Sequence, residues 1–396
     1  MPSLFLVTLF ALFTAPAALA GSSCIAFDAG FELLAFGFGG KDYNVGTSDQ
    51  WASGKPTDIT ASGRPPFDGT SAKCYLAQFF NAVYVLGADK SNPASIYIYD
   101  AGKKSWSTQS TTPGGFDPTS FEAILDHDTN IFYALSKGEL WSLDMKDLVA
   151  AGSSAIVWQD DGAAEINTSN YDPVMAIAQN HIFFFGVPGV TPGNAPIFVI
   201  HFGFWQEGSQ SFSSDFPDTH GQTTSFFLDS GVQEEIAFVP DDGSHTYIIN
   251  VQSNTTQTIA GPSTVDAGAT YFASTTALVQ LAANGALSYL PYSATDKSAN
   301  SAAKWAPIAA FNSIAGATPG GGSSAGGSSA AGGASNSGSA KGGSAASNTG
   351  SGSGAKSTGS SSGSAPAPSG TGAATRQVAW GSGMVMALVA VGLSLL

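Results

Sequence analysis

Short apolar segments separated by turn residues recur along the first three quarters of the chain. The clearest set occupies residues 74–79, 82–87 and 95–100, followed by a fourth short segment around Trp106. These segments are rich in residues that favour strands, and Gly87-Ala88 and Asp100-Ala101-Gly102 supply turns between them. Four short antiparallel strands in about forty residues make a sheet too small to bury its own faces, which is typical of one propeller blade.

Further copies of this pattern fill residues 22–311. The first copy runs from Cys24 to Gly37, and the second takes the same thirteen steps from Cys74 to Gly87. The strands expected in the later copies are 121–125 and 130–135; 174–178, 180–186 and 197–200; 224–228, 235–239 and 246–251; and 271–274, 277–281 and 286–289. Tryptophans mark the outer edge of five copies, with Thr258 in the sixth place: Trp51, Trp106, Trp158, Trp205 and Trp305. Their spacing of about fifty residues predicts six blades, with five or seven as the alternatives.

Residues 83–108, VYVLGADKSNPASIYIYDAGKKSWST, resemble a Kelch repeat. The likeness consists of an apolar strand that ends at a glycine pair, an aromatic strand that ends in Tyr-Asp, and a following Trp. Gly87-Ala88 departs from the usual double glycine, and Gly39-Gly40 keeps it at a displaced position. The other copies keep the apolar spacing and the Trp better than the glycines. The resemblance implies an all-β, six-bladed propeller with four-stranded blades, similar to Kelch and galactose-oxidase-like domains.

The two cysteines, Cys24 and Cys74, hold equivalent positions in neighbouring copies. An even pair outside the cytoplasm favours a disulfide, which would join the first blade to the second. Two free buried thiols are the alternative.

The N-terminus carries the pattern of a secretory signal peptide, assigned to residues 1–20. An apolar run at 4–13 precedes Ala18-Leu19-Ala20, a small-x-small cleavage site. The propeller is accordingly assigned to residues 21–311. Two N-glycosylation sequons, at Asn167 and Asn254, agree with secretion.

Residues 312–371 are predicted to be a disordered stalk of Ser, Gly and Ala that O-glycosylation would stiffen. Residues 372–396 have the order of a glycolipid (GPI) anchor signal: small residues at Gly372, a spacer, then an apolar tail to the last residue. We expect attachment at Gly372, with a single membrane span from Val378 as the alternative. The expected address is the secretory pathway, the outer face of the plasma membrane and the cell wall. With leader, stalk and anchor, the chain looks like uncharacterised secreted propellers of fungal cell surfaces.

The charges of the chain are predominantly acidic. All 29 acidic residues and 11 of the 14 basic residues lie in 21–311, a net charge of −18. An acidic surface without a basic stripe argues against a nucleic-acid partner and is typical of a soluble secreted protein.

One class of loop carries a recurring aspartate motif. Phe67-Asp68-Gly69-Thr70-Ser71 recurs forty-nine residues later as Phe116-Asp117-Pro118-Thr119-Ser120, and weaker copies occur near Asp172, His220 and Asp266. Each motif precedes an inner strand, so we expect Asp68, Asp117, Asp172, Asp266 and His220 on one rim of the channel. Converging carboxylates suit Ca²⁺ or sugar hydroxyls. Asp before Gly or Pro is also an ordinary turn signal, and no other cofactor or metal is indicated.

The histidines show no spacing that would direct two rings at one metal, and each is expected to be a solvated or hydrogen-bonded turn residue. With both cysteines assigned to each other, we do not expect the copper-radical oxidase activity known from this fold. The sequence favours a monomeric, non-catalytic binding and display propeller for cell-wall polysaccharide or a surface protein. The alternatives are a glycan-active hydrolase or lyase that uses rim carboxylates, and a purely structural wall protein.

Overall fold

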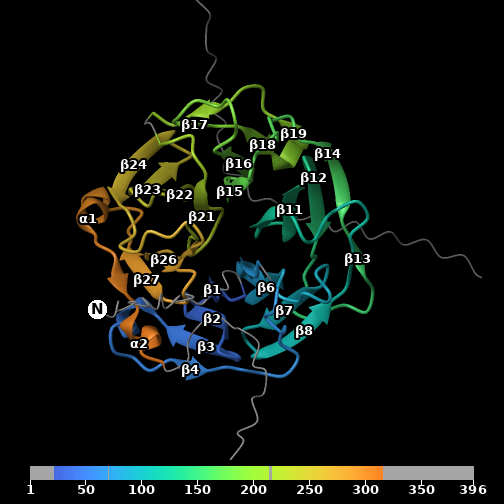
Figure 1. The fold of residues 1–396 in the computed structure, drawn as a ribbon, viewed down its shortest axis with the longest axis vertical. Coiled ribbons are helices and arrows are strands. Elements are labelled where there is room, and N and C mark those ends of the chain that lie inside the picture. The colour runs from blue at the N-terminus through green and yellow to red at the C-terminus, as the bar shows by residue number, and fades with distance from the viewer. Residues whose placement is uncertain (1–21, 70, 214–215, 315–396) are drawn as a thin grey trace, which may run out of the picture. The chain divides into compact units, whose positions relative to one another are not determined.

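The computed structural model describes residues 22–69, 71–213 and 216–314. Within these residues the chain forms six four-stranded antiparallel sheets arranged around a central channel (Figure 1). The all-β, six-bladed propeller is therefore confirmed. The predicted signal peptide, nearly all of the predicted stalk and the predicted anchor signal lie outside the described residues.

The blades follow the order of the chain, and the first strand of each blade is the innermost. The first blade contains β1 (Cys24–Phe27), β2 (Leu33–Phe38), β3 (Lys41–Gly46) and β4 (Thr57–Asp58), and the second contains β5 (Lys73–Ala77), β6 (Ala82–Leu86), β7 (Ile96–Asp100) and β8 (Ser105–Gln109). The third contains β10 (Glu122–Asp126), β11 (Ile131–Ser136), β12 (Glu139–Asp144) and β14 (Gln159–Ala163), and the fourth contains β15 (Val174–Ala178), β16 (His181–Phe185), β18 (Ile197–Val199) and β19 (Phe204–Trp205). The fifth contains β21 (Gly221–Ser225), β22 (Glu235–Pro240), β23 (His245–Asn250) and β24 (Thr255–Ala260), and the sixth contains β25 (Thr270–Ala273), β26 (Ala277–Leu281), β27 (Leu287–Pro291) and β28 (Ala306–Pro307).

Short elements lie between and beside the blades. They comprise the parallel pair β9 (Thr111–Thr112) and β13 (Ile156–Val157), the antiparallel pair β17 (Asn194–Ala195) and β20 (Gln210–Ser211), the helices α1 (Lys297–Ala302) and α2 (Ala309–Asn312), and the 3₁₀ turns η1 (Ser48–Gln50), η2 (Gln78–Phe80) and η3 (Ile200–Phe202). The blade pattern in the sequence gave no indication of β9, β13, β17 and β20, because their pairing depends on neighbours distant in the chain.

The aromatic markers of the outer edge are placed much as expected. Trp106, Trp205 and Thr258 lie in the outermost strands of their blades, and Trp158 and Trp305 directly precede β14 and β28. Trp51 differs, because it follows η1 and lies several residues before β4. Its indole N–H donates to the carbonyl of Gly46 at 2.9 Å, and its ring packs edge-on against Tyr289 of the sixth blade, with centroids 4.8 Å apart.

The ring is closed without exchange of a strand between the ends of the described chain. Each innermost strand lies beside the next, and β25 lies beside β1. The helix α2 covers this junction: the Ala310 N–H donates to the Trp51 carbonyl at 3.0 Å. The Phe311 ring packs edge-on against Phe38, with centroids 4.9 Å apart. Apolar packing and one backbone hydrogen bond therefore join the last blade to the first.

Both faces of a blade pack against neighbouring blades, which explains why the strands are continuous apolar runs. All five residues of β6, AVYVL, are buried. Aromatic rings fill the spaces between blades: Phe36 meets Trp106 at 5.2 Å between the first and second blades, and Phe185 stacks on Phe238 at 5.4 Å between the fourth and fifth. Strands buried on both faces lack the polar alternation of half-exposed strands.

Glycine at the end of the second strand permits close approach of the loop that enters the blade. Gly87 and Gly186 have φ of +68° and +64°. A Cβ on Gly87 would lie 2.4 Å from the Ser71 carbonyl, and one on Gly186 would lie 2.9 Å from that of Thr219. The recurring glycine is therefore required both by backbone conformation and by contact with the aspartate-bearing loops.

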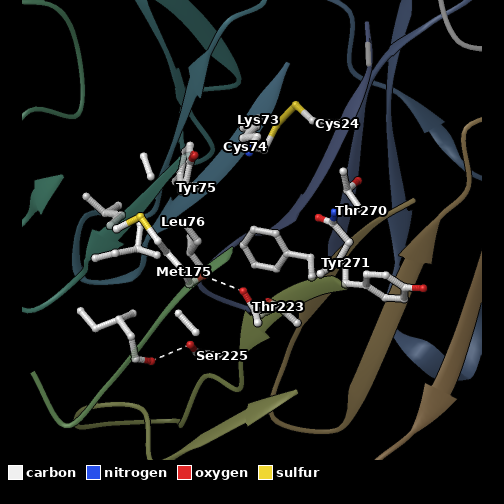
Figure 2. A pocket seen from close by; sticks show the side chains of 18 of the residues that line it. Cys24, Lys73, Cys74, Tyr75, Leu76, Met175, Thr223, Ser225, Thr270 and Tyr271 are labelled. Atoms are coloured by element: carbon white, nitrogen blue, oxygen red, sulfur yellow. Dashed lines mark hydrogen bonds between the residues drawn. A yellow bond between two sulfur atoms is a disulfide. The ribbon is translucent and has the colours of Figure 1, made fainter. Parts of the chain in front are cut away.

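The predicted disulfide is confirmed. Cys24 in β1 and Cys74 in β5 are bonded, with Cα atoms 5.7 Å apart, and the bond joins the innermost strands of the first two blades (Figure 2). Both cysteines of the chain are used by this bond.

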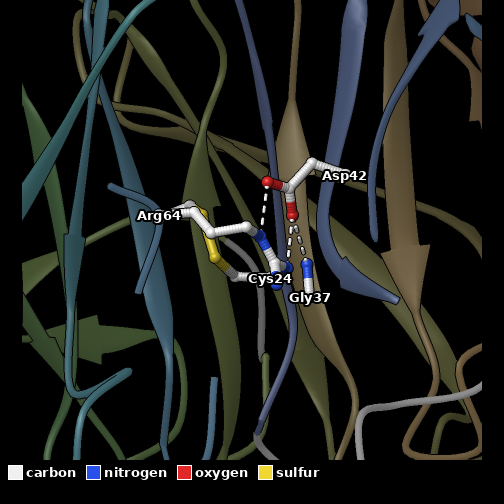
Figure 3. Close-up of a disulfide and its surroundings, with 5 residues drawn as sticks. Cys24, Gly37, Asp42 and Arg64 are labelled. Atoms are coloured by element: carbon white, nitrogen blue, oxygen red, sulfur yellow. Dashed lines mark hydrogen bonds and ion pairs between the residues drawn. A yellow bond between two sulfur atoms is a disulfide. The ribbon is translucent and has the colours of Figure 1, made fainter. Parts of the chain in front are cut away.

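A buried ion pair lies near the disulfide. The Asp42 carboxylate is wholly buried and accepts hydrogen bonds from Arg64 Nε at 2.9 Å and Arg64 Nη2 at 2.8 Å (Figure 3). The Gly37 N–H donates to the same carboxylate at 3.0 Å, and the guanidinium lies 4.9 Å from the centre of the Phe67 ring. Arg64 thus fixes the segment that leads from the first blade into the second.

Candidate binding site at the mouth of the channel

The aspartate-bearing loops all precede innermost strands, as the sequence predicts, but their side chains do not converge. Asp68 accepts a hydrogen bond from the Lys90 N–H at 2.9 Å. Asp266 accepts from the N–H groups of Gly268 at 3.0 Å and Ala283 at 2.7 Å. These carboxylates stabilise loops, which is the turn role that the sequence left open.

Asp117 is also held by its own surroundings. Its Oδ1 accepts from the Thr119 hydroxyl at 2.6 Å, and its Oδ2 lies 3.0 Å from Lys137 Nζ. The Thr119 hydroxyl and then the Lys137 ammonium lower the pKa of Asp117 to about 2. Of the predicted rim residues, the structure brings together only Asp172 and His220, whose Oδ2 and Nε2 lie 3.5 Å apart.

Low carboxyl pKa values in this and other loops predict how stability depends on pH. Burial raises the pKa of Asp89, but hydrogen bonds from Ser91, Tyr97 and Asn92 together lower it to about 2. The pKa of Asp117 is also about 2. A folded-state pKa below the unfolded value stabilises the fold above about pH 4, and this contribution is lost as the pH falls toward 2. We expect the free energy of unfolding, measured by urea titration at several pH values, to fall over this interval and to fall less steeply in Asp89→Asn. Asp218→Asn, which removes an exposed carboxyl, is the matched control; equal slopes in all three proteins would contradict the assignment.

Asp172 and His220 belong to a cavity of about 370 Å³ at one end of the channel, which we call the mouth cavity. Its polar lining comprises Ser23, Ser71, Lys73, Glu122, Asp172, His220, Gln222, Thr223 and Thr270. These residues come from innermost strands or from the loops directly before them, so all six blades contribute polar groups to one opening.

Two charged arrangements define the electrostatics of the mouth cavity. Lys73 of β5 and Glu122 of β10 form an ion pair between the second and third blades. On the opposite side, His220 Nδ1 lies 2.8 Å from Asp241 Oδ2, while Nε2 faces the largely exposed Asp172. The lining therefore combines one neutralised pair with an imidazole held between two carboxylates.

A narrower cavity of about 150 Å³, here called the shaft, adjoins the mouth cavity and shares Lys73, Glu122 and Thr223 with it. Figure 2 shows side chains of the innermost strands around it. The Thr223 hydroxyl donates to the Met175 carbonyl at 2.6 Å, and the Ser225 hydroxyl donates to that of Ile177 at 2.5 Å. These hydrogen bonds satisfy two carbonyl groups on the free edge of β15, where no other strand pairs with it.

The far end of the shaft is closed by residues 226–234, the loop between β21 and β22, which we call the plug loop. Phe227 and Gln233 of this loop line the shaft. The Gln78 amide, beyond the end of β5, donates to the Leu228 carbonyl at 2.7 Å across 150 residues of sequence. The Gln179 N–H donates to the Gln233 carbonyl at 2.8 Å.

Aromatic contacts complete this closure. The Phe227 ring stacks on Phe272 with centroids 5.9 Å apart, and the centroid of the His127 ring lies 5.3 Å from that of Phe227. The second, third, fourth and sixth blades therefore all hold the plug loop of the fifth. The channel is open at the mouth cavity and closed at the other end.

Two sequence predictions are corrected here. Residues 224–228 were expected to form an inner strand, but β21 spans Gly221–Ser225 and Phe226-Phe227-Leu228 enter the plug loop. His127 was expected to be a solvated or hydrogen-bonded turn residue. It lies in the β10–β11 turn, but it is only 1% exposed, so the expectation of a solvated side chain is wrong. Burial lowers the pKa of His127 and so favours the neutral form of its ring.

The other predicted sites have simple positions. Asn167 and Asn254 are both exposed, and Gly372 lies outside the described residues. Within the described part of the chain, no group of three or more His, Cys, Asp or Glu side chains could hold a metal ion. Over the same residues, no helix has the length and apolar character needed to cross a membrane.

Sequence reasoning missed Lys73, Glu122 and Asp241, although a signal for the first two was present. Lys73 follows Asp68 by five residues and Glu122 follows Asp117 by five, so the ion pair occupies equivalent positions of two copies. Asp241 lies directly after β22 and has no counterpart at this spacing.

No protein-family model matches the sequence, and no curated protein matches it significantly. The fold is thus established by the arrangement of the strands.

Proposed function

We propose that the protein is a non-catalytic binding and display module of the cell surface, and that the mouth cavity holds its ligand. One observation carries this proposal: the plug loop makes the channel a dead-end pocket with a polar opening. The opening, about 370 Å³ in volume, falls within the roughly 300–1,000 Å³ that is usual for ligand sites.

The chemistry of the mouth cavity suits a ligand rich in hydroxyl groups. Asp172 is an exposed acceptor, whereas Gln222 and Thr223 can both donate and accept. A sugar hydroxyl also donates and accepts, so a cell-wall polysaccharide is the preferred ligand, and a group on a surface protein is the alternative. The likeness to Kelch and galactose-oxidase-like propellers and to secreted surface propellers supports this choice. The leader, stalk and anchor predicted from the sequence support a location at the outer face of the plasma membrane or in the cell wall, where we expect the protein to act as a monomer.

The experiment is a glycan array probed with the purified protein, followed by titration of the selected glycan. Asp172→Asn and His220→Ala are expected to weaken binding by at least tenfold, because both side chains line the mouth cavity. Asp117→Asn is the matched control, since this rim carboxylate is bonded to Thr119 and Lys137 instead. Unchanged affinity in both mouth variants would reject the mouth cavity as the binding site. If no glycan binds, a polysaccharide ligand is rejected, and a surface-protein ligand or a structural wall protein is left.

A second candidate function is a glycan-active hydrolase or lyase. It is favoured by His220, which contacts Asp241 through Nδ1 and faces Asp172 through Nε2 in the arrangement of an oriented acid–base group. The same titration distinguishes the two functions. Reducing ends that accumulate with time, and that disappear in His220→Ala, would support catalysis, whereas stable binding without turnover supports the display module.

A further inference from the structure

A second cavity of about 370 Å³ lies between the fifth and sixth blades, at the end of the molecule opposite the mouth cavity. Its walls are the plug loop, the ends of β22 and β23, the β25–β26 turn and the residues after β27. These segments follow the ends of innermost and third strands, whereas the mouth cavity lies where innermost strands begin. The two cavities have no lining residue in common, so they are separate sites.

A buried carboxylate forms the floor of this second cavity. Glu235, at the start of β22, is 9% exposed and accepts a hydrogen bond from the Asn250 amide at 3.1 Å. Its other oxygen accepts a hydrogen bond from the Tyr292 hydroxyl. Burial, and then Glu235 itself, raise the pKa of Tyr292, so the phenol stays protonated and remains a donor. The Tyr292 ring stacks on Phe226 at 3.8 Å, which fixes the position of the hydroxyl.

The rest of the lining supplies hydrogen-bond acceptors and hydroxyls. The carboxylates of Asp229 and Glu234 join Glu235, and Thr276 contributes a hydroxyl. Among the lining residues that the structure describes, none is Lys, Arg or His. Each carboxylate oxygen can accept more than one hydrogen bond, so the engaged oxygens of Glu235 can still receive donors from a ligand. A ligand that complements this lining supplies donors and positive charge.

We propose that this cavity binds a sugar ring that carries a protonated amino group. The ring hydroxyls would pair with Thr276, and the ammonium group would lie among Asp229, Glu234 and Glu235. The cavity volume lies at the lower end of the range for small-molecule sites, which matches one or two sugar rings. Hydrogen bonds to ionised groups are stronger than those between neutral groups, so the ammonium gives the site its selectivity.

The test is titration calorimetry of the purified protein with glucosamine, glucose, glucuronate and putrescine. Glucosamine is expected to bind at least tenfold more tightly than glucose, and glucuronate is expected not to bind, because its charge repels the three carboxylates. Putrescine, an amine without hydroxyls, is expected to bind at least tenfold more weakly than glucosamine. Equal affinity for glucosamine and glucose would overturn the role of charge, and equal affinity for putrescine would overturn the role of the ring.

Variants locate the binding within the structure. Asp229→Asn and Glu234→Gln change side chains outside the buried floor and are expected to weaken glucosamine binding at least fivefold each without changing the melting temperature. Asp242→Asn removes an exposed carboxyl of the same blade outside the cavity and is the matched control. Asp172→Asn in the mouth cavity is expected to leave glucosamine binding unchanged. If glucosamine fails to bind while the array glycan still binds at the mouth cavity, this inference falls and the proposed function stands.

Discussion

Replacing both cysteines by alanine is expected to lower the free energy of unfolding by about 4 kcal/mol. The disulfide closes a loop of 50 residues, and the chain-entropy estimate for a loop of this length is about 4 kcal/mol. The effect should be large because Cys24 and Cys74 lie in the innermost strands of two blades that no strand exchange ties together.

The measurement is urea unfolding of the wild type and of Cys24→Ala/Cys74→Ala, each with and without reductant. Reductant should destabilise the wild type by nearly the same amount as the double substitution and should leave the variant unchanged. This comparison separates the loss of the bond from the loss of two buried sulfur atoms. A loss below about 1 kcal/mol in both experiments would show that blade packing alone holds this junction.

The second large effect is expected for Arg64→Met, which should lower the free energy of unfolding by about 3–5 kcal/mol. Removal of one partner from a buried ion pair leaves an uncompensated charge, and this costs more than the pair itself contributes. Asp42 is wholly buried, and without Arg64 its side chain would keep only the hydrogen bond from the Gly37 N–H.

A double variant distinguishes the stranded charge from lost packing. Arg64→Met combined with Asp42→Asn should recover much of the stability, because a neutral amide costs less to bury than a carboxylate. Lys41→Met is the matched control, since it breaks an ion pair whose side chains are 55% and 44% exposed and should cost less than about 1 kcal/mol. Equal losses for Arg64→Met and Lys41→Met would contradict the account.

The blade pattern could be predicted from sequence because it is local. Strands 174–178 and 277–281 were predicted with the same bounds as β15 and β26, since apolar runs flanked by turn residues define them. The pairing of Cys24 with Cys74 also followed from the repeat, because equivalent positions of adjacent blades lie side by side.

The plug loop could not be predicted, for a physical reason. Phe226-Phe227-Leu228 has the local character of a strand, and only contacts with Gln78, His127 and Phe272 draw it across the channel. These partners are far away in the sequence and in different blades. A run of apolar residues specifies burial, but it does not specify whether the residues are buried in a sheet or against the floor of a cavity.

Only part of the candidate site could be predicted, because the sequence shows local turn signals but not contacts between blades. Asp in a turn that contains Gly or Pro is a local signal, and local hydrogen bonds explain the positions of Asp117 and Asp266. The sequence could not indicate that Asp172 differs from them, because its partner His220 lies in the next blade. Whether Lys73 and Glu122 face each other also depends on how adjacent blades pack, although the sequence shows them at equivalent positions of two copies.

The account rests on the mouth cavity as the place where a surface ligand binds. Its most direct test is the diffraction pattern of crystals of the purified protein soaked in a mixture of cell-wall oligosaccharides. We expect density for at least one sugar ring in the mouth cavity, within hydrogen-bond distance of Asp172 or of the Lys73–Glu122 pair. Sugar density confined to the outer strands of the blades, with the mouth cavity free of ligand, would contradict the account.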